Sequence, residues 1–308
     1  MKKYILIFYI IIMSIKIVFG QNYIPYYQKR IEAEVYFCQN KVQNALQSYQ
    51  EAFSIKPALA GDLYNASICA ALLNQDSLMF LFVESCLESG VEMKIFTQNI
   101  AVFKKYFENP KWQELLEKSK IYYDNYLSKL NWEYINLLKS LTEKDQAVRK
   151  KIKPYMFNHR NLQISKKRIR NMIIVDSCNN IIIDSLINLY GYPNRENVGI
   201  HYQIKHPDFI CLWHRVDSLF VDIVYNAMLN GDVLPESYAE KKEYATRRFL
   251  YGTMYTYKKK ITQQEREFIN KNRLQIGMKT IEEDEIVRKY FDETKYKYKF
   301  YCDFNFLK

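Results

Sequence analysis

The sequence predicts a mainly α-helical chain, with helical hairpins over residues 21–140 and a mainly helical domain over residues 141–308 that includes a minor β hairpin. Apolar residues recur at spacings of three and four through most of the chain, which is the helical period. The 308 residues include only 8 glycines and 7 prolines, and several glycines directly follow periodic segments, where they end helices. A hydrophobic content of 48% is enough for packed cores and excludes a disordered chain.

The first 20 residues are predicted to be a signal peptide. Two lysines precede an unbroken apolar run over residues 4–13, and small residues at 18 and 20 predict cleavage before Gln21. The run is about half of the ~20 residues that a spanning helix needs, so an uncleaved anchor is the alternative. We expect export to the periplasm or beyond, with no transmembrane segment after the signal is removed.

The formal net charge of +11 invites a nucleic-acid interpretation. Lysine and tyrosine are common throughout the sequence, however, which indicates a general composition rather than a dedicated surface. Export would also separate the protein from most nucleic acid, so we expect no nucleic-acid partner. A basic run between Lys139 and Arg170 is typical of a solvated face, or of a site for anionic polymers or lipid head groups.

Cysteine and histidine spacing predicts no metal or cofactor. No Cys-x-x-Cys pair occurs, and His201, His206 and His214 are spaced by five and eight residues, which does not place them on one helical face. No glycine-rich phosphate loop occurs either. The pairing of the cysteines and the oligomeric state stay open. The cysteines are Cys38, Cys69, Cys86, Cys178, Cys211 and Cys302.

Residues 31–57 predict a close pair of antiparallel helices, because small and aromatic residues alternate at regular positions and a proline ends the second helix. These positions are Ala33, Tyr36, Ala45, Tyr49, Ala52 and Pro57. Small side chains allow two helices to cross closely, and aromatic rings fill the adjoining groove. The spacing resembles the tetratricopeptide repeat, and a degenerate second copy follows 34 residues later. The resemblance implies a groove that holds a peptide or protein partner.

Helical spacing continues over residues 94–141, and a domain boundary is expected near residue 140. Thr142 with Asp145 three residues later is typical of a capped helix start. Further helices are predicted over residues 172–190, 207–229, 235–251, 262–272 and 280–291. The alternation of lysine and aromatic residues over 295–300 predicts an edge strand that pairs with residues 253–257.

Two of the few glycines and one proline gather in the stretch Gly191 to Gly199. Gly191 supplies a left-handed cap for the helix before it, and Pro193 prevents the helix from continuing. We therefore interpret the stretch as a corner that redirects the chain.

Several pieces of the second half follow one another in a characteristic order. They are Asp145-Gln146-Ala147-Val148-Arg149, Asp176 with Asn179 or Asn180, Gly191-x-Pro193, Val198-Gly199, His214, Tyr251-Gly252-Thr253 and Asn272-Arg273 with Ile276-Gly277-Met278. Together they resemble an uncharacterised bacterial domain family of unknown function over residues 140–290. The resemblance implies a fold unit and a set of residues but no activity. The family's Asp-Arg pair ahead of Tyr-Gly-Thr lacks its aspartate here.

Four residues are the candidate site: Asp145, Arg149, Asp176 and His214. His214 is the best candidate general base, although a lone histidine on an apolar face is also typical of a core. Arg149 offers a planar fork to a carboxylate or phosphate, and Asp145 or Asp176 would orient the base. Ser218 lies four residues after His214 and would share its helical face as a candidate nucleophile.

The sequence favours an exported binding or scaffold protein whose repeat region engages a peptide or protein. The alternative is a periplasmic hydrolase with His214 as general base and Arg149 as anion holder. The two functions differ in one expectation, because the hydrolase needs His214, Arg149 and Asp176 within about 10 Å of one another.

Overall fold

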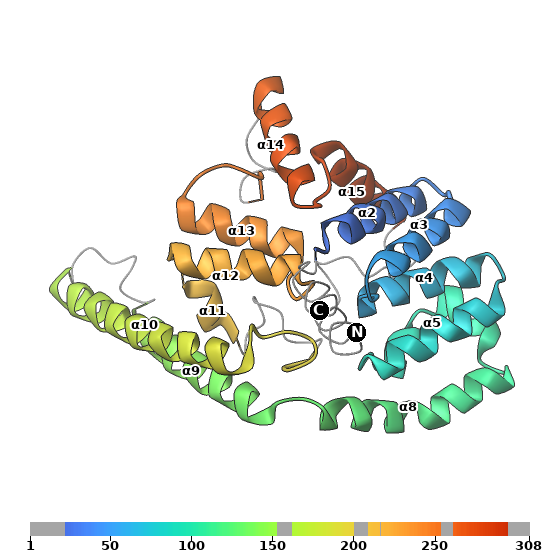
Figure 1. Ribbon diagram of the computed structural model, residues 1–308, viewed down its shortest axis with the longest axis horizontal. Coiled ribbons are helices and arrows are strands. Elements are labelled where there is room, and N and C mark those ends of the chain that lie inside the picture. Colours follow the sequence, from blue (N-terminus) through green and yellow to red (C-terminus); the bar gives the residue numbers. More distant parts are fainter. Residues whose placement is uncertain (1–21, 153–161, 200–208, 216, 254–260, 295–308) are drawn as a thin grey trace, which may run out of the picture.

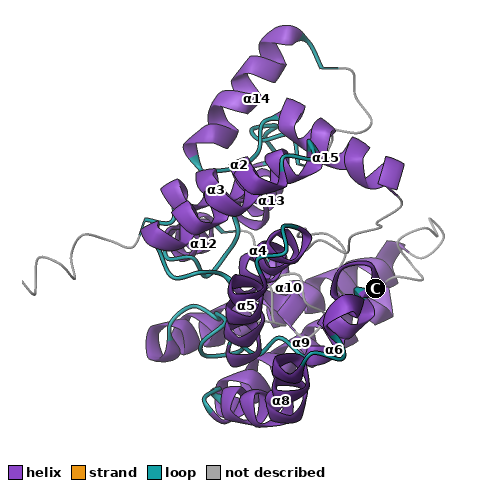
Figure 2. Ribbon diagram, turned by 90° about the vertical axis from the view of Figure 1, so that its right-hand side faces the viewer, coloured by secondary structure: helices purple, strands orange, loops and turns teal. Residues whose placement is uncertain are grey.

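The computed structural model describes residues 22–152, 162–199, 209–215, 217–253 and 261–294, and every regular element among them is a helix (Figures 1 and 2). The prediction of a mainly α fold is confirmed. The predicted signal peptide lies outside the described residues, as do the predicted strands over 253–257 and 295–300, apart from Thr253.

The first half contains α2 (Ile24–Cys38), α3 (Val42–Ile55), α4 (Ala60–Leu72), α5 (Asp76–Glu88), α6 (Met93–Gln98), α7 (Ile100–Phe103), the 3₁₀ turn η1 (Lys104–Tyr106), α8 (Pro110–Ser128) and α9 (Trp132–Ile152). The second half contains α10 (Leu162–Tyr190), α11 (Ile210–His214), α12 (Ser218–Leu229), α13 (Pro235–Thr246), α14 (Gln263–Gln275) and α15 (Ile281–Thr294). The chain runs from α2–α5 through α8 to the α9–α10 hairpin and returns through α11–α13 to α15, which packs beside α2 (Figure 1).

Small residues allow the first helices to pack closely, as their spacing predicts. Ala33 of α2 and Ala45 and Ala52 of α3 are fully buried where these two helices meet. In the next hairpin Ala70 and Cys86 are equally buried between α4 and α5. Removing these short side chains from water while the helix axes approach closely is what stabilises each hairpin.

The interior consists of two clusters of buried apolar side chains, and each draws on both sides of residue 140. The first lies among α2–α8 and includes Tyr290 and Phe291 of α15. The second lies among α9–α13 and includes Tyr26 and Tyr27 of α2. The predicted boundary at 140 falls inside α9, which is continuous. The first helix therefore packs against the last part of the chain as well as against its own hairpin partner.

The helix predicted over 172–190 starts earlier, at Leu162, and the limits of two later predicted helices are also wrong. The segment 207–229 is not one helix, because α11 ends at His214 and α12 starts only at Ser218, where the Asp217 carboxylate accepts a hydrogen bond from the Phe220 N–H at 2.9 Å. The helix predicted over 235–251 ends at Thr246, where Arg247 adopts a left-handed conformation with φ of 55°.

The corner after α10 is the junction of several helices. Gly191 has φ of +78°, and its N–H donates to the Ile187 carbonyl at 2.8 Å, which is the predicted left-handed cap. The Asn197 side chain donates to the Tyr190 and Tyr192 carbonyls at 3.1 and 3.0 Å.

Side chains and backbone groups from three other segments reach the same corner. Tyr134 of α9 donates to the Gly191 carbonyl at 3.0 Å, and Tyr126 of α8 donates to the Arg195 carbonyl at 3.1 Å. Arg195 in turn donates to the Ala58 carbonyl at 3.2 Å. The rare turn residues are gathered here because the corner joins the first helices to α10.

Asp232, beside this corner, gives the stability of the fold a pH dependence. Burial raises the pKa of Asp232 to about 6, while the charge of Arg195 and a hydrogen bond from Asn194 lower it and the charge of Glu196 raises it. A carboxylate with a raised pKa costs stability in its ionised form, so stability falls as pH rises from about 4 to about 6.

Replacing Asp232 by asparagine is therefore expected to increase the free energy of unfolding at pH 7.5 by about 1–2 kcal/mol, after allowing for solvent screening, and to leave it nearly unchanged at pH 4. Urea unfolding at the two pH values measures the difference. Asp222→Asn at an exposed site on α12 is the control. An equal effect of Asp232→Asn at both pH values would contradict the assignment.

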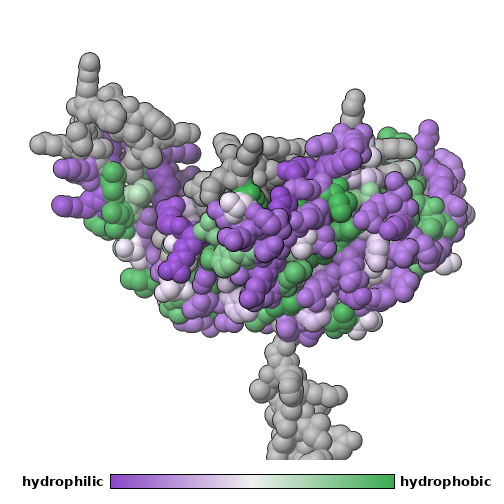
Figure 3. All heavy atoms as spheres, turned by 90° about the horizontal axis from the view of Figure 1, so that it is seen from above, coloured by the Kyte–Doolittle hydropathy of each residue, from purple (hydrophilic) through white to green (hydrophobic). Residues whose placement is uncertain are grey.

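One helix is longer and more apolar than the sequence analysis expects. Within α10, the segment Lys166–Tyr190 is long and apolar enough to cross a membrane by length and composition alone, and 17% of its apolar window is buried. This criterion concerns length and composition and does not test the expectation that no transmembrane segment follows the signal. Figure 3 shows both hydrophilic and hydrophobic side chains at the end of the molecule where the α9–α10 hairpin projects.

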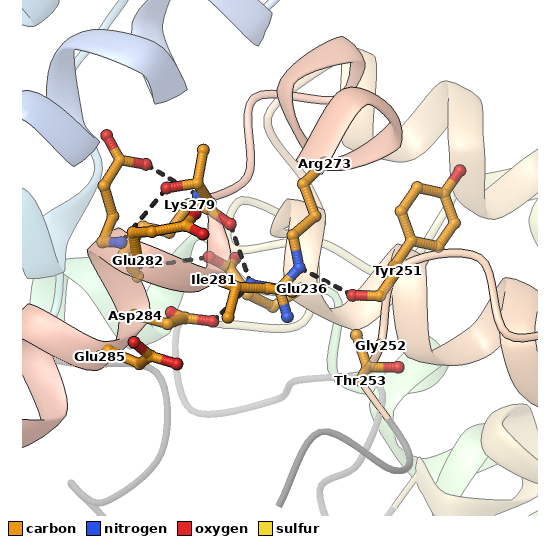
Figure 4. A network of polar contacts seen from close by, with 12 residues as sticks. Glu236, Tyr251, Gly252, Thr253, Arg273, Lys279, Ile281, Glu282, Asp284 and Glu285 are labelled. Carbon is orange, nitrogen blue, oxygen red and sulfur yellow. Dashed lines mark hydrogen bonds and ion pairs between the residues drawn. The ribbon is translucent and has the colours of Figure 1, made fainter. Parts of the chain in front are cut away.

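A buried polar network fastens α2 to the last helices (Figure 4). Glu34 of α2 accepts hydrogen bonds from Lys279 Nζ at 2.7 Å and from Arg30 Nε at 3.2 Å. Lys279 also lies 3.7 Å from Glu236 at the start of α13. Nearby, Arg273 of α14 donates to the Asp284 carboxylate at 2.6 Å. Lys279 therefore ties α2 to α13 and to the loop before α15 through charges that are shielded from water, and Arg273 ties α14 to α15.

Candidate functional site

Asp145 is the centre of the candidate site. It lies in the middle of α9 and is only 1% exposed. Its carboxylate accepts from Gln146 Nε2 at 2.8 Å and lies 2.7 Å from Arg149 Nη1 and 2.8 Å from His214 Nδ1. The prediction that Asp145 belongs to a helix cap is wrong, because three side chains satisfy its oxygens within a continuous helix.

Arg149 links α9 to α10. One helical turn separates it from Asp145, so both side chains lie on the same face. Its Nη1 and Nη2 donate to the two carboxylate oxygens of Asp176 at 2.9 and 3.1 Å, which is a paired, bidentate geometry. The guanidinium therefore bridges two carboxylates of its own chain, and this contact fixes the position of Asp145 relative to α10.

His214 is the last residue of α11 and reaches Asp145 across 69 positions of sequence. Because a carboxylate only accepts hydrogen bonds, Nδ1 of the imidazole carries the proton in this contact. About a fifth of the side chain is exposed. Among the described residues no hydrogen-bond partner meets Nε2, so a lone pair is left there in the neutral ring. The alternative of a sealed core histidine does not fit this exposure.

The end of α11 is held by a buried lysine that the sequence analysis missed. Lys241 of α13 is fully buried, and its Nζ donates to the carbonyls of Leu212 at 3.1 Å, Trp213 at 2.8 Å and Arg215. Burial lowers the pKa of Lys241 to about 7, while the charge of Asp217 raises it and that of Arg215 lowers it. The three carbonyl acceptors match the three N–H groups of an ammonium. Because Lys241 binds the last carbonyls of α11, the helix ends directly after His214.

Arg215, directly after α11, binds a carboxylate of α10. Its Nη1 donates to the Asp184 carboxylate at 2.5 Å and its Nε donates to Asp217 at 2.5 Å. The backbone of Arg215 is extended, so the chain leaves α11 before α12 begins. Ser218 therefore does not share a helical face with His214, and the pairing predicted from their spacing of four is wrong.

A thiol lies one turn before His214 but is not activated. Cys211 is buried and accepts a hydrogen bond from Thr142 Oγ at 3.2 Å. Burial raises the pKa of Cys211 to about 11, an effect that the Thr142 hydrogen bond opposes and the Asp145 charge adds to. The sulfur is therefore a protonated thiol near neutral pH rather than a nucleophile.

The Tyr251-Gly252-Thr253 segment has a structural carboxylate of its own. Glu243, near the end of α13, accepts hydrogen bonds from the backbone N–H groups of residues 250–253 and from Thr253 Oγ1. Glu243 thus occupies a nest of backbone N–H groups. This segment is therefore part of the scaffold near the site.

The structure thus brings Asp145, Arg149, Asp176 and His214 into one connected group, as the hydrolase alternative expects of them. Two carboxylates face one guanidinium, and a protonated His214 would balance the remaining negative charge. Among the described residues no group of three or more His, Cys, Asp or Glu side chains could hold a metal ion. Lys241 and Arg215 gave no signal in the sequence, because their partners are mostly carbonyls and carboxylates distant along the chain.

Comparisons with protein-family models, with curated proteins and with solved structures find no match to this chain. Neither the domain family nor the repeat resemblance gains support from them, and a proposal of function rests on the side chains of the site.

Proposed function

We propose that the chain is a hydrolase in which His214 activates a water molecule as general base. The observation that carries the proposal is the 2.8 Å contact between His214 Nδ1 and the buried Asp145 carboxylate. Asp145 orients the imidazole and stabilises the imidazolium that forms when Nε2 takes a proton. Arg149 and Asp176 are positioning residues, because they hold Asp145 and do not themselves need to touch substrate.

Water is the nucleophile that this arrangement favours. The Cys211 thiol is protonated and bonded to Thr142, and Ser218 lies beyond the break after His214. The two carboxylates outnumber the one guanidinium, and both terminal nitrogens of Arg149 already bind them. We therefore place Arg149 as a support rather than as the anion holder. An uncharged ester or amide suits the site better than a phosphate.

The test is hydrolysis of a panel of chromogenic esters, amides, glycosides and phosphates by the wild-type chain. We expect turnover of an ester or amide, and a reduction of 10²–10⁴-fold in kcat/KM by His214→Gln, the usual contribution of a positioned base. Asp145→Asn should lower kcat more than it changes KM, and Asp222→Asn at an exposed position should leave the rate unchanged.

Each variant is first checked for unaltered helical content, so that loss of activity is not confused with loss of fold. Turnover by His214→Gln at the wild-type rate, or no turnover of any of the four classes, would contradict the proposal.

A second candidate function is an exported binding or scaffold protein. The stacked hairpins α2–α5 support it, because paired helices with small buried residues are the units from which peptide-binding repeats are built. Export itself is proposed from the charged and apolar leader pattern of residues 1–20. Recovery of no partner from an envelope fraction at low salt would count against this function and would leave the hydrolase proposal intact.

A further inference from the structure

The outer face of α10 is uncharged over five turns. The exposed residues between positions 171 and 189 are Asn171, Ile173, Ile174, Ser177, Cys178, Ile181, Ile182, Ser185, Asn188 and Leu189. Half of them are large aliphatic side chains, and Ile181 and Leu189 are 69% and 70% exposed. Five large aliphatic side chains exposed on one helix, with only uncharged residues between them, mark an interaction site rather than the scattered apolar residues of an ordinary surface.

The opposite face of α10 is committed to the fold. Ile183 and Leu186 are buried against the second core cluster. Asp176 pairs with Arg149, and Asp184 pairs with Arg215. A helix that spanned a bilayer would have to carry these carboxylates and their packed partners into the hydrocarbon core. The apolar face of α10 is therefore better suited to lie along a membrane surface than to cross it.

The uncharged face continues into a basic end. Lys166, Lys167 and Arg170 are exposed one to two turns before Ile173 and Ile174, on the same side of the helix. Lys150 and Lys151 at the end of α9 lie beside them, because Arg168 Nη1 donates to the Lys151 carbonyl at 2.6 Å. No aspartate or glutamate occurs between residues 146 and 175. The described residues at this end of the hairpin, Lys150, Lys151, Lys166, Lys167 and Arg170, therefore contribute only positive charge.

We propose that this face of α10 docks on the surface of an anionic lipid bilayer, with the isoleucines inserted at the interface and the lysines on the head groups. Basic residues beside an aliphatic face on one helix are the pattern of interfacial helices. A second copy offers no free carboxylate to the basic end, since the two acidic residues of α10, Asp176 and Asp184, are held in ion pairs by Arg149 and Arg215. The proposal goes beyond the hydrolase and does not depend on it.

Flotation with vesicles tests the proposal. The chain starting at Gln21 is used, because it keeps every described residue and lacks the apolar run of the leader, which would bind vesicles itself. We expect binding to vesicles of phosphatidylglycerol and phosphatidylcholine that weakens with salt, and much weaker binding to phosphatidylcholine alone. Replacing Lys166, Lys167 and Arg170 together by glutamine should weaken partitioning roughly 100-fold. Ile174→Ser with Ile181→Ser should weaken it by at least about 10-fold.

Matched controls lie on other helices. Leu81→Ser with Ile121→Ser removes side chains that are 56% and 60% exposed on α5 and α8, and glutamine at Lys94, Lys118 and Lys289 removes three exposed charges. These controls should bind as wild type does. Equal binding to neutral and anionic vesicles, no binding to either, or binding unaffected by the α10 substitutions would overturn the proposal. A dimer that Ile174→Ser and Ile181→Ser dissociate, in a chain that does not float, would assign the face to a second copy instead.

Discussion

Replacing Glu243 by alanine is expected to lower the free energy of unfolding by about 4 kcal/mol or more. The carboxylate is 2% exposed and accepts from Leu250 N at 2.8 Å, Gly252 N at 2.7 Å and Thr253 N at 2.9 Å, besides Tyr251 N. Alanine leaves four backbone N–H groups of one loop without an acceptor, those of Tyr251 and Gly252 buried and those of Leu250 and Thr253 partly buried. Each buried unpaired donor costs about 1–3 kcal/mol. Urea unfolding followed by circular dichroism measures the loss.

Glu243→Ala should first increase local opening of the loop over residues 250–253, before the whole fold unfolds. Arg273 Nε donates to the Tyr251 carbonyl at 2.7 Å. Because this hydrogen bond holds α14 against the loop, opening the loop also weakens the packing of α14. Amide exchange at residues 250–253 should accelerate under conditions where the core is still folded. Glu293→Ala, at an exposed position of α15, is the control and should change stability by less than about 0.5 kcal/mol. A cost for Glu243→Ala as small as that of the control would contradict the role given to this carboxylate.

Replacing Lys279 by methionine is expected to cost about 3–5 kcal/mol, the usual effect of removing one partner from a buried ion pair. Lys279 meets Glu34 at 2.7 Å and Glu236 at 3.7 Å, and all three side chains are shielded from water (Figure 4). Methionine has a similar length but no charge, so Glu34 loses the cation that acts on it most strongly and, among the described residues, Glu236 keeps only Arg30, at 3.8 Å. Thermal and urea unfolding measure the cost, and Lys289→Met, an exposed position on α15, is the matched control.

The Lys279→Met variant should also reverse one part of the pH dependence. Burial acts to raise the pKa of Glu34, but the charges of Lys279 and Arg30 outweigh it and the pKa is lowered. In the wild type the stability that Glu34 provides is therefore present above its ordinary pKa and is lost as pH falls. Without Lys279 the effect of burial on the pKa of Glu34 is opposed by fewer positive charges. Protonation of Glu34 at low pH should therefore restore part of the lost stability.

Glu34→Gln combined with Lys279→Met should cost less than the sum of the single changes, because the double variant leaves one buried charge fewer without a partner. Additive effects would show that the two side chains do not interact across the junction between α2 and the loop before α15.

Much of the helical arrangement could be predicted from local patterns. The positions of Ala33, Ala45 and Ala52 indicate a close hairpin, and Gly191 indicates the end of α10, because both signals depend on steric properties of single residues. The four candidate site residues also meet as a group. Arg149 offers its planar fork to a carboxylate, and the carboxylates that it binds are Asp145 and Asp176 of its own chain.

The rest depended on tertiary contacts that no local pattern carries. Thr142 and Asp145 have the spacing of a helix cap. In the structure their side chains instead form hydrogen bonds with Cys211 and His214 of another helix, and α9 continues through both positions. The break between α11 and α12 is held by Lys241, whose carbonyl partners lie 26 to 29 positions earlier in the chain. A buried lysine in a polar helix looks like a surface residue until the fold places carbonyls around it.

The central claim is that Asp145 holds His214 with its proton on Nδ1 and its lone pair on Nε2. Nitrogen-detected NMR of histidine-labelled protein at neutral or mildly alkaline pH reads this tautomer directly, without a substrate. We expect the neutral His214 ring to be protonated at Nδ1, with a hydrogen-bonded proton that disappears or changes tautomer in Asp145→Asn. A neutral ring protonated at Nε2 in the wild type, or a His214 signal unchanged by Asp145→Asn, would contradict the account.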